Sequence, residues 1–220
     1  PPFLHRYHYV AVTGFDDVRG YVLYQDGYSP DEVDDYESFQ DDWHGGDHWA
    51  LVVFPPERTF SFLSADDHRE LAALCEPRES WDAAAAHLRA VLELEPDDAD
   101  ALVGLASALS RGGHADDATR EFERALARAP GDARAMNNFA QHLVRSGGDL
   151  ARAEELARAA LASAPALAGY VDDTLGQVLA ARGDREGARA AFAAALAQLR
   201  TDQDSLRRRV LARLEAIASR

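Results

Sequence analysis

The sequence predicts an α+β protein, in which a partial antiparallel sheet is followed by an all-α solenoid of stacked helical hairpins. Its composition changes near residue 63. Before that point, short apolar or alternating segments predict strands, and 12 acidic residues stand against 3 basic ones. After it the chain is rich in Ala and Arg, and prolines recur at a nearly constant spacing, which is typical of a helical repeat. We expect the sheet in residues 1–62, about four helical hairpins in residues 63–202 and a capping helix in residues 203–220.

Three segments of the first part have the pattern of strands, namely Tyr7–Thr13, Tyr21–Tyr24 and Trp49–Phe54. The first two are joined by the sequence GFDDVRG, whose Gly and Asp residues suit a hairpin turn. A long acidic connection follows the second strand, and within it Asp34–Trp43 is expected to form a short helix with Tyr36, Phe39 and Trp43 on one face. Such a sheet is too small to be stable alone. Because the first residue is Pro, we expect the chain to be a piece of a longer protein.

In the second part, Pro96, Pro130 and Pro165 lie 34 and 35 residues apart, which is the period of tetratricopeptide repeats. Small and large apolar residues recur at matching places. The unit between the first two prolines has Leu102, Leu105, Ala106, Leu109, Ala118, Phe122 and Ala125, and the next has Met136, Phe139, Ala140, Leu143, Ala153, Ala157 and Ala160. A third unit has Leu175, Gly176, Leu179, Ala188, Phe192 and Ala195, and a weaker unit precedes all three, with Leu71, Ala72, Ala84, Leu88 and Val91.

The turns and the last segment agree with this repeat. The sequences RGGHAD, SGGDLA and RGDREG place Gly and Asp where the first helix of each hairpin must end and the second must begin. Residues 204–219 are amphipathic with an Arg-rich face, which is expected of a helix that caps a repeat array.

The overall charge excludes some classes of partner. The net charge is −15 and the isoelectric point is near 4.8, and all 23 basic residues are Arg. This balance argues against a sequence-independent grip on nucleic acid and against docking on anionic membranes. The sequence has no apolar run of about 18 residues, so it predicts no membrane span. The one cysteine, Cys75, allows no disulfide within the chain.

The first helices of stacked hairpins form a concave groove, in which we expect a protein or peptide ligand. The predicted groove residues are Asp100, Val103, Ser107, Arg134, Asn137, Gln141, Tyr170, Asp173 and Gln177. They mix both signs of charge and include no basic cluster that would select a peptide carboxylate. The sequence therefore predicts the groove without naming its ligand.

One pair of residues in the first part suggests catalysis. His8 begins the first predicted strand and Asp26 follows the second, so a hairpin could place the two side by side. In papain-like cysteine peptidases a His takes the proton of a Cys thiol, and an Asp or Asn on the neighbouring strand holds the imidazole in the right tautomer. His5 is an alternative base, although the strand register favours His8.

The stretch HYVAVTGFDD, followed by GYVLYQDG, FQDDW and HWALVVFPP, resembles the C-terminal half of bacterial bacteriocin-processing-like (double-glycine leader peptidase-like) cysteine peptidases. The resemblance covers residues 5–56. It implies that His8 is the general base and that Asp26 orients it. Some members of that family continue into tetratricopeptide repeats after a similar strand. The resemblance also implies a bacterial, exported or periplasmic protein, a compartment that the residues themselves do not give.

Two hypotheses follow. In the first, the chain is a fragment of a peptidase that hydrolyses a peptide substrate with a Cys-His-Asp triad, fused to an interaction region. The family's nucleophile lies upstream of the His and outside this chain, so the chain alone would be inactive; Cys75 lies in a repeat helix and is expected to be a packing residue. In the alternative, the chain is a non-catalytic scaffold or adaptor, and its peptidase-like part is only structural.

No metal or cofactor is expected. The sequence WHGGDH contains His44, Asp47 and His48, but Gly45 and Gly46 argue against the helix that would make the two His side chains converge. The acidic run of residues 31–42 lacks the spacing of a calcium loop and is expected to be solvated.

Overall fold

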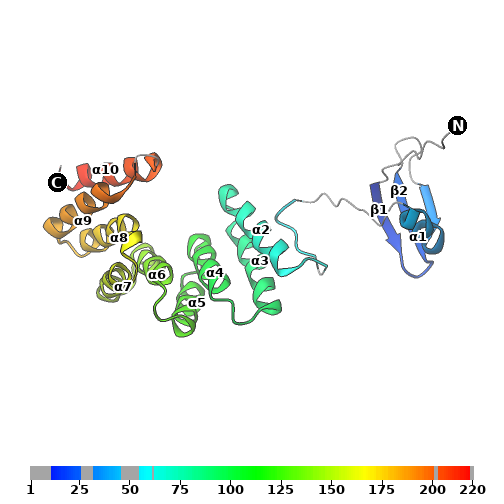
Figure 1. The fold of residues 1–220 in the computed structure, drawn as a ribbon, viewed down its shortest axis with the longest axis horizontal. Helices are drawn as coiled ribbons and strands as arrows, with labels where there is room; N and C mark the ends of the chain where they lie inside the picture. Colours follow the sequence, from blue (N-terminus) through cyan, green and yellow to red (C-terminus); the bar gives the residue numbers. More distant parts are fainter. Residues whose placement is uncertain (1–10, 26–31, 46–54, 61, 201–202, 219–220) are drawn as a thin grey trace. The chain divides into compact units, whose positions relative to one another are not determined.

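The computed structural model describes residues 11–25, 32–45, 55–60, 62–200 and 203–218. The chain divides into two compact units, Pro1–Phe54 and Pro55–Arg220 (Figure 1). In its described residues the first contains a small sheet and a helix, and the described part of the second is helical.

The N-terminal unit contains a three-stranded antiparallel sheet in the order β1 (Ala11–Asp16), β2 (Tyr21–Gln25) and β3 (Glu32–Asp35). The turn between β1 and β2 is closed by Asp16, whose Oδ1 accepts hydrogen bonds from the backbone N–H groups of Val18 and Arg19, both at 3.1 Å. Helix α1 (Tyr36–Gly45) follows β3, and the ring of Phe39 lies 5.8 Å from the ring of Tyr24 on β2. The helix therefore packs on one face of the sheet.

This sheet differs in detail from the sequence prediction. The first strand runs to Asp16 instead of ending at Thr13, and the helix spans Tyr36–Gly45 instead of Asp34–Trp43. A strand at Glu32–Asp35 was not predicted, because its acidic residues have a low strand propensity; pairing with the free edge of β2 overrides that propensity. The predicted strand Trp49–Phe54 lies outside the described residues.

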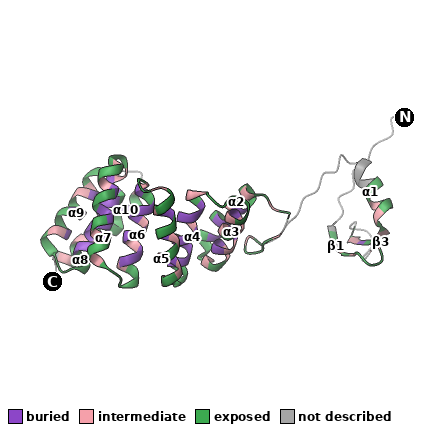
Figure 2. Cartoon of the chain, turned by 90° about the horizontal axis from the view of Figure 1, so that it is seen from below, coloured by how far each residue is buried: buried purple, intermediate pink, exposed green. Residues whose placement is uncertain are grey.

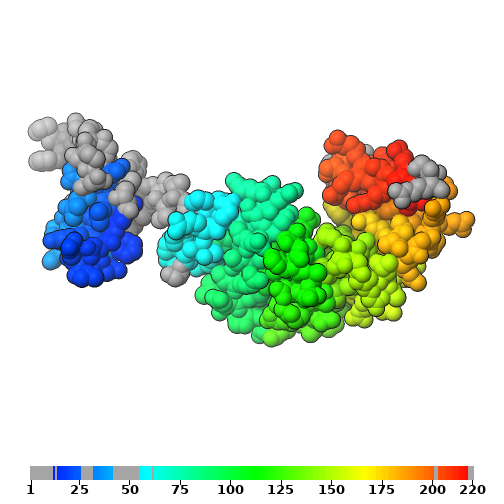
Figure 3. Space-filling model, turned by 180° about the vertical axis from the view of Figure 1, so that it is seen from behind, coloured from blue at the N-terminus to red at the C-terminus, as the bar shows by residue number. Residues whose placement is uncertain are grey.

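The helical unit is a series of four helical hairpins. The described helices are α2 (Ala65–Cys75), α3 (Trp81–Leu94), α4 (Ala99–Gly112), α5 (Ala115–Arg128), α6 (Ala133–Ser146), α7 (Leu150–Ser163), α8 (Ala168–Ala181), α9 (Arg185–Gln198) and α10 (Asp204–Ala218). Each helix packs against the next, and α6 also packs against α4 and α8 (Figure 1). Short 3₁₀ turns at Glu76–Arg78 and Pro165–Leu167 lead into α3 and α8. The space-filling view shows successive hairpins in direct contact (Figure 3). The repeat architecture expected from the proline spacing is confirmed.

Residues at the helix ends explain why each helix begins and ends where it does. The carboxylates of Asp98, Asp132 and Asp149 accept hydrogen bonds from backbone N–H groups in the first turns of α4, α6 and α7. Gly113 and Gly147 end α4 and α6 in the left-handed conformation, with φ of 88° and 69°, which side-chain-bearing residues adopt at a cost. Gly and Asp therefore cap the helices at these positions. In the turn RGGHAD the prediction is only partly right, because Gly113 ends α4 but α5 begins after His114 without a side-chain cap.

Most of the core is one apolar cluster that runs through the hairpins, and Leu102, Val103, Ala125 and Ala135 form a second, smaller cluster. The buried inner faces of the helices are seen in Figure 2. The ring of Phe122 on α5 stacks on that of Phe139 on α6, with 5.2 Å between ring centroids and 12° between ring planes. Small residues allow close approach elsewhere: a Cβ on Gly176 of α8 would lie 2.5 Å from the ring of Phe192 on α9. No helix in the described part of the chain is long and apolar enough to cross a membrane.

Candidate binding groove between the hairpins

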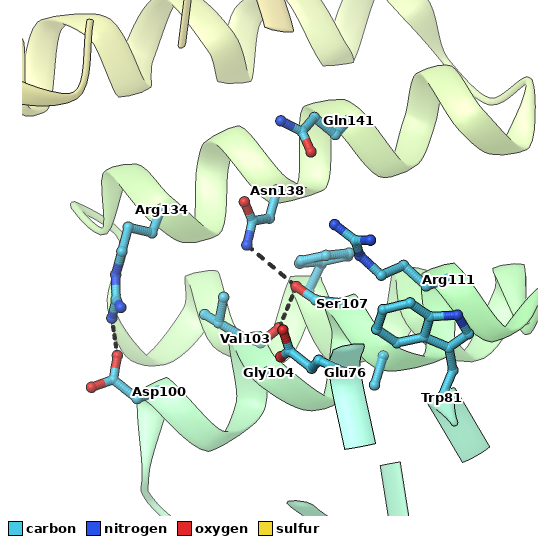
Figure 4. A pocket seen from close by; sticks show the side chains of 12 residues that line it. Glu76, Trp81, Asp100, Val103, Gly104, Ser107, Arg111, Arg134, Asn138 and Gln141 are labelled. Carbon is cyan, nitrogen blue, oxygen red and sulfur yellow. Dashed lines mark hydrogen bonds and ion pairs between the residues drawn. The ribbon is translucent and has the colours of Figure 1, made fainter. Parts of the chain in front are cut away.

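A cavity of about 270 Å³ lies between the first helices of the second and third hairpins (Figure 4). Helices α4 and α6 provide most of its wall, and the neighbouring elements add the rest. Its lining residues are Asp100, Val103, Gly104, Ser107, Ala108 and Arg111 of α4, Arg134, Asn138 and Gln141 of α6, and Glu76, Trp81 and Phe122.

Charged side chains stand at both ends of this cavity. At one end Arg134 on α6 forms an ion pair with Asp100 on α4. At the other end the guanidinium of Arg111 lies over the ring of Trp81, with 4.9 Å from Cζ to the ring centroid, as in a cation–π contact (Figure 4). These contacts fix the positions of the Arg134 and Arg111 side chains at the two ends.

The middle of the cavity is lined by amide and hydroxyl groups. The Asn138 amide donates from Nδ2 to the Ser107 hydroxyl at 3.3 Å, and that hydroxyl donates to the backbone carbonyl of Val103 at 2.8 Å. The Gln141 amide donates from Nε2 to the Thr174 hydroxyl on α8 at 2.9 Å. The cavity thus combines fixed hydrogen-bonding groups with an apolar floor that includes Ala108 and Phe122.

Five of the predicted groove residues line this cavity, namely Asp100, Val103, Ser107, Arg134 and Gln141. Asn137 does not. Its side chain is buried, and its Oδ1 has no hydrogen-bond partner among the described residues. The next residue, Asn138, faces the cavity instead.

The three predicted groove residues on α8 are bonded within the chain. The Tyr170 hydroxyl accepts a hydrogen bond from Gln203 at 2.5 Å, and the Asp173 carboxylate pairs with Arg213 of α10. The Gln177 amide donates to the Asp173 carboxylate at 3.2 Å. This part of the predicted groove is therefore engaged by the chain's own C-terminal residues, whereas the cavity between α4 and α6 is open.

Sequence reasoning missed Trp81, Arg111, Asn138 and Glu76 as cavity residues. Glu76 belongs to the 3₁₀ turn between α2 and α3, and Trp81 is the first residue of α3, so their positions depend on how the hairpins stack. Arg111 occupies the last turn of α4, where a basic side chain also suits the helix dipole. A Trp directly after the turn between two predicted helices is the one signal in the sequence that could have pointed to this end of the cavity.

The predicted catalytic pair, His8 and Asp26, lies outside the described residues, as do Asp47 and His48. His44 belongs to α1. Cys75 is completely buried, and its thiol donates a hydrogen bond to the Pro56 carbonyl at 3.3 Å. Burial raises the pKa of this thiol, which disfavours the reactive thiolate. The part of the chain that the structure describes contains no group of three His, Cys, Asp or Glu residues that could hold a metal ion.

Comparisons with known proteins agree with the architecture of the helical unit. Residues 78–138 match the family model of the tetratricopeptide repeat. A thermophilic TPR protein of Thermus thermophilus is similar in structure, with 22% identity, a TM-score of 0.62 and coverage of 70% of this chain and 81% of that chain. PilF of Pseudomonas aeruginosa has 24% identity, a TM-score of 0.60 and coverage of 70% and 67%.

A MamA fragment from Desulfovibrio magneticus has 18% identity, a TM-score of 0.53 and coverage of 70% and 93%. No curated protein matches the chain. These similarities give no support to a papain-like peptidase part. They support tetratricopeptide repeats in the helical unit and, with them, a protein-interaction region.

Proposed function

We propose that this chain is a non-catalytic scaffold or adaptor that binds a protein segment in the groove between α4 and α6. The observation that carries this proposal is the cavity of about 270 Å³ between the two helices, which is lined by hydrogen-bonding side chains of both. Hydrogen-bonding groups that converge in one recess are typical of specific ligand sites.

The chemistry of the cavity suits an extended peptide. The Ser107 hydroxyl and the amides of Asn138 and Gln141 can exchange hydrogen bonds with backbone N–H and C=O groups of a ligand. The edge of the Trp81 ring and the Ala108 methyl offer apolar contact for a side chain. A ligand with this pattern would be fixed by its main chain and selected by one anchoring side chain.

The peptidase hypothesis is the weaker of the two. It depends on His8 and Asp26, which lie outside the described residues, and on a nucleophile outside the chain. The family model and the similar structures support the repeats alone. The scaffold hypothesis needs only residues that the structure describes.

A selection of random 12-residue peptides displayed on phage, with the full chain as bait, tests the proposal. We expect enriched peptides to bind the chain, and binding to weaken at least tenfold in Ser107→Trp, because the indole would fill the cavity. The matched control is Arg124→Ala, which removes a long side chain from the exposed face of α5, where Arg124 pairs with Glu121.

If the enriched peptides bind Ser107→Trp as tightly as wild type, the binding surface lies elsewhere and the proposal is wrong. Absence of any enriched peptide over repeated selections would also count against the proposal. Circular dichroism of both variants shows whether the helices persist, so a folding defect is separated from a blocked cavity.

A further inference from the structure

Two buried histidines meet in the first hairpin. His68 of α2 is 4% exposed and His87 of α3 is completely buried, and their Nδ1 atoms lie 2.8 Å apart. The Nε2 atom of His87 lies 2.7 Å from the backbone carbonyl oxygen of Pro56. The Cys75 thiol donates to the same carbonyl at 3.3 Å. The Pro56 carbonyl, which is held by two side chains, thus attaches the segment of residues 55–60 to the hairpin.

Hydrogen-bond chemistry limits the number of protons that this arrangement can hold. A carbonyl oxygen only accepts, so His87 must carry a proton on Nε2. Only one proton fits between the two Nδ1 atoms at 2.8 Å. Two neutral rings satisfy both conditions when His68 donates from Nδ1 to His87. The pair can then take up one further proton, but with two further protons both Nδ1 atoms would carry a hydrogen and neither could accept. The attached state therefore cannot hold two imidazolium ions.

The surroundings of His68 oppose an additional proton on its ring. Burial lowers the pKa of His68, and the neighbouring His87 lowers it further. The carboxylates of Asp67 on α2 and Glu93 on α3 act in the opposite direction and are outweighed. On the side of the attached segment, Glu57 lies near the Cys75 thiol and within 3.5 Å of the Ser80 hydroxyl. Helix α4 directs its Asp100 and Arg111 toward the cavity described above.

We propose that the His68–His87 pair is a proton-operated latch that holds residues 55–60 on the first hairpin and releases them in acid. The two Nδ1 atoms that share this proton belong to α2 and α3, so release acts by freeing the two rings to turn apart into solvent. Each ring can then carry a proton, so acid favours the released state. The transition should involve between one and two protons, which makes it steeper than the titration of one histidine. Release uncovers the Cys75 side of the first hairpin, an end of the repeat stack that the attached segment now covers.

Cys75 provides the measurement, because it is the one cysteine of the chain and is completely buried beneath Pro56. The rate of its reaction with 4,4′-dithiodipyridine is measured from pH 7.5 to pH 5.0 and divided by the rate for glutathione in the same buffer. This ratio removes the intrinsic effect of pH on thiol reactivity. We expect the ratio to rise at least tenfold toward pH 5.0, while far-ultraviolet circular dichroism shows that the helices persist.

Variants identify the groups that titrate. In His87→Gln the amide can still donate to the Pro56 carbonyl and accept from His68, and only one ring of the pair remains to titrate. The rise in the rate ratio should therefore be at least threefold smaller, and its pH dependence should be no steeper than the titration of one proton. The double variant His68→Gln/His87→Gln should show no rise. His142→Gln is the matched control, since it removes another buried histidine, on α6, and should leave the rise unchanged.

Three results would overturn the latch. They are a ratio that stays flat in wild type, a rise that persists in the double variant, and a rise that coincides with loss of the helical signal. If the double variant does not fold, hydrogen exchange of the Arg58 amide in wild type decides, because this amide donates to the Pro55 carbonyl within the attached segment. Its protection should fall below pH 6 before that of amides in α4, and equal loss in both would refute the proposal.

Discussion

Arg213 on α10 donates from Nη1 to both carboxylate oxygens of Asp173 on α8, at 2.6 and 2.5 Å. Asp173 is buried, and in the described part of the chain its other side-chain contact is with Gln177 on the same helix. This pair fastens the last described helix to the fourth hairpin and explains why the predicted groove residues on α8 are not open.

Replacement of Arg213 by Ala should leave the Asp173 carboxylate buried with one weak donor. Because Arg213 is one-third exposed, the expected loss is about 1–3 kcal/mol of unfolding free energy. Urea denaturation followed by circular dichroism measures this loss. Arg158→Ala, which removes an exposed pair with Glu154, should cost less than about 0.5 kcal/mol. Equal effects would show that the α10 contact does not stabilise the array.

Gly176→Ala should destabilise the fourth hairpin by about 1–3 kcal/mol, because the new methyl group would overlap the ring of Phe192. Gly131→Ala is the matched control, since nothing lies within 4 Å of the position that its Cβ would take. Thermal unfolding of the two variants should therefore separate them clearly. A Gly176→Ala protein as stable as wild type would mean that α8 and α9 can move apart without cost.

Phe122→Ala should cost about 3–5 kcal/mol, because it empties a buried site and removes a ring stacked on Phe139. Phe62→Ala removes the same side chain from a position that is 64% exposed and should change stability little. Chemical denaturation of both variants checks the contrast, and similar losses would contradict the core assignment.

Stability should also depend on pH through His142, which is buried and contacts the hydroxyls of Ser110 and Thr119. Burial and the nearby Arg145 lower the pKa of His142 below its ordinary value of 6.5. A histidine whose pKa is lowered by folding stabilises the protein above its unfolded pKa, and that contribution is lost as the pH falls below about 6.5.

We therefore expect the free energy of unfolding to decrease between pH 7.5 and pH 5.5, and to decrease less steeply in His142→Gln. Urea titrations at fixed ionic strength provide the measurement. His68, whose pKa is also lowered, contributes a slope of the same sign that remains in this variant. Identical slopes for wild type and variant would exclude His142 as a contributor.

The repeat architecture could be predicted because residues that begin and end helices recur in the sequence from one unit to the next. Pro130 precedes the third hairpin, Asp132 caps α6, and Gly147 ends it, so the period is visible without knowledge of contacts between hairpins. The N-terminal sheet could be predicted only in outline. Strand β3 is stabilised by its pairing with β2, and the sequence of an acidic segment such as Glu32–Asp35 does not contain that information.

On α4 and α6, the residues that line the cavity could be predicted to within one position. Ser107 and Gln141 line the cavity as expected, whereas Asn137 is buried and its neighbour Asn138 takes its place. Which of two adjacent amides faces the cavity depends on the rotation of α6 against α4 and α8, a property of packing between helices. On α8 the predicted groove residue Asp173 is not open because it pairs with Arg213, which lies 40 residues further along the chain.

The stacked rings of Phe122 and Phe139 also bear on how the array unfolds. They join the second helix of one hairpin to the first helix of the next, and His142 adds a third ring within 5.6 Å of Phe122. In a linear repeat protein, cooperativity depends on the coupling between neighbouring units. With so strong a coupling at this junction, the second and third hairpins should melt as one block, so the two helices that enclose the cavity are kept or lost together.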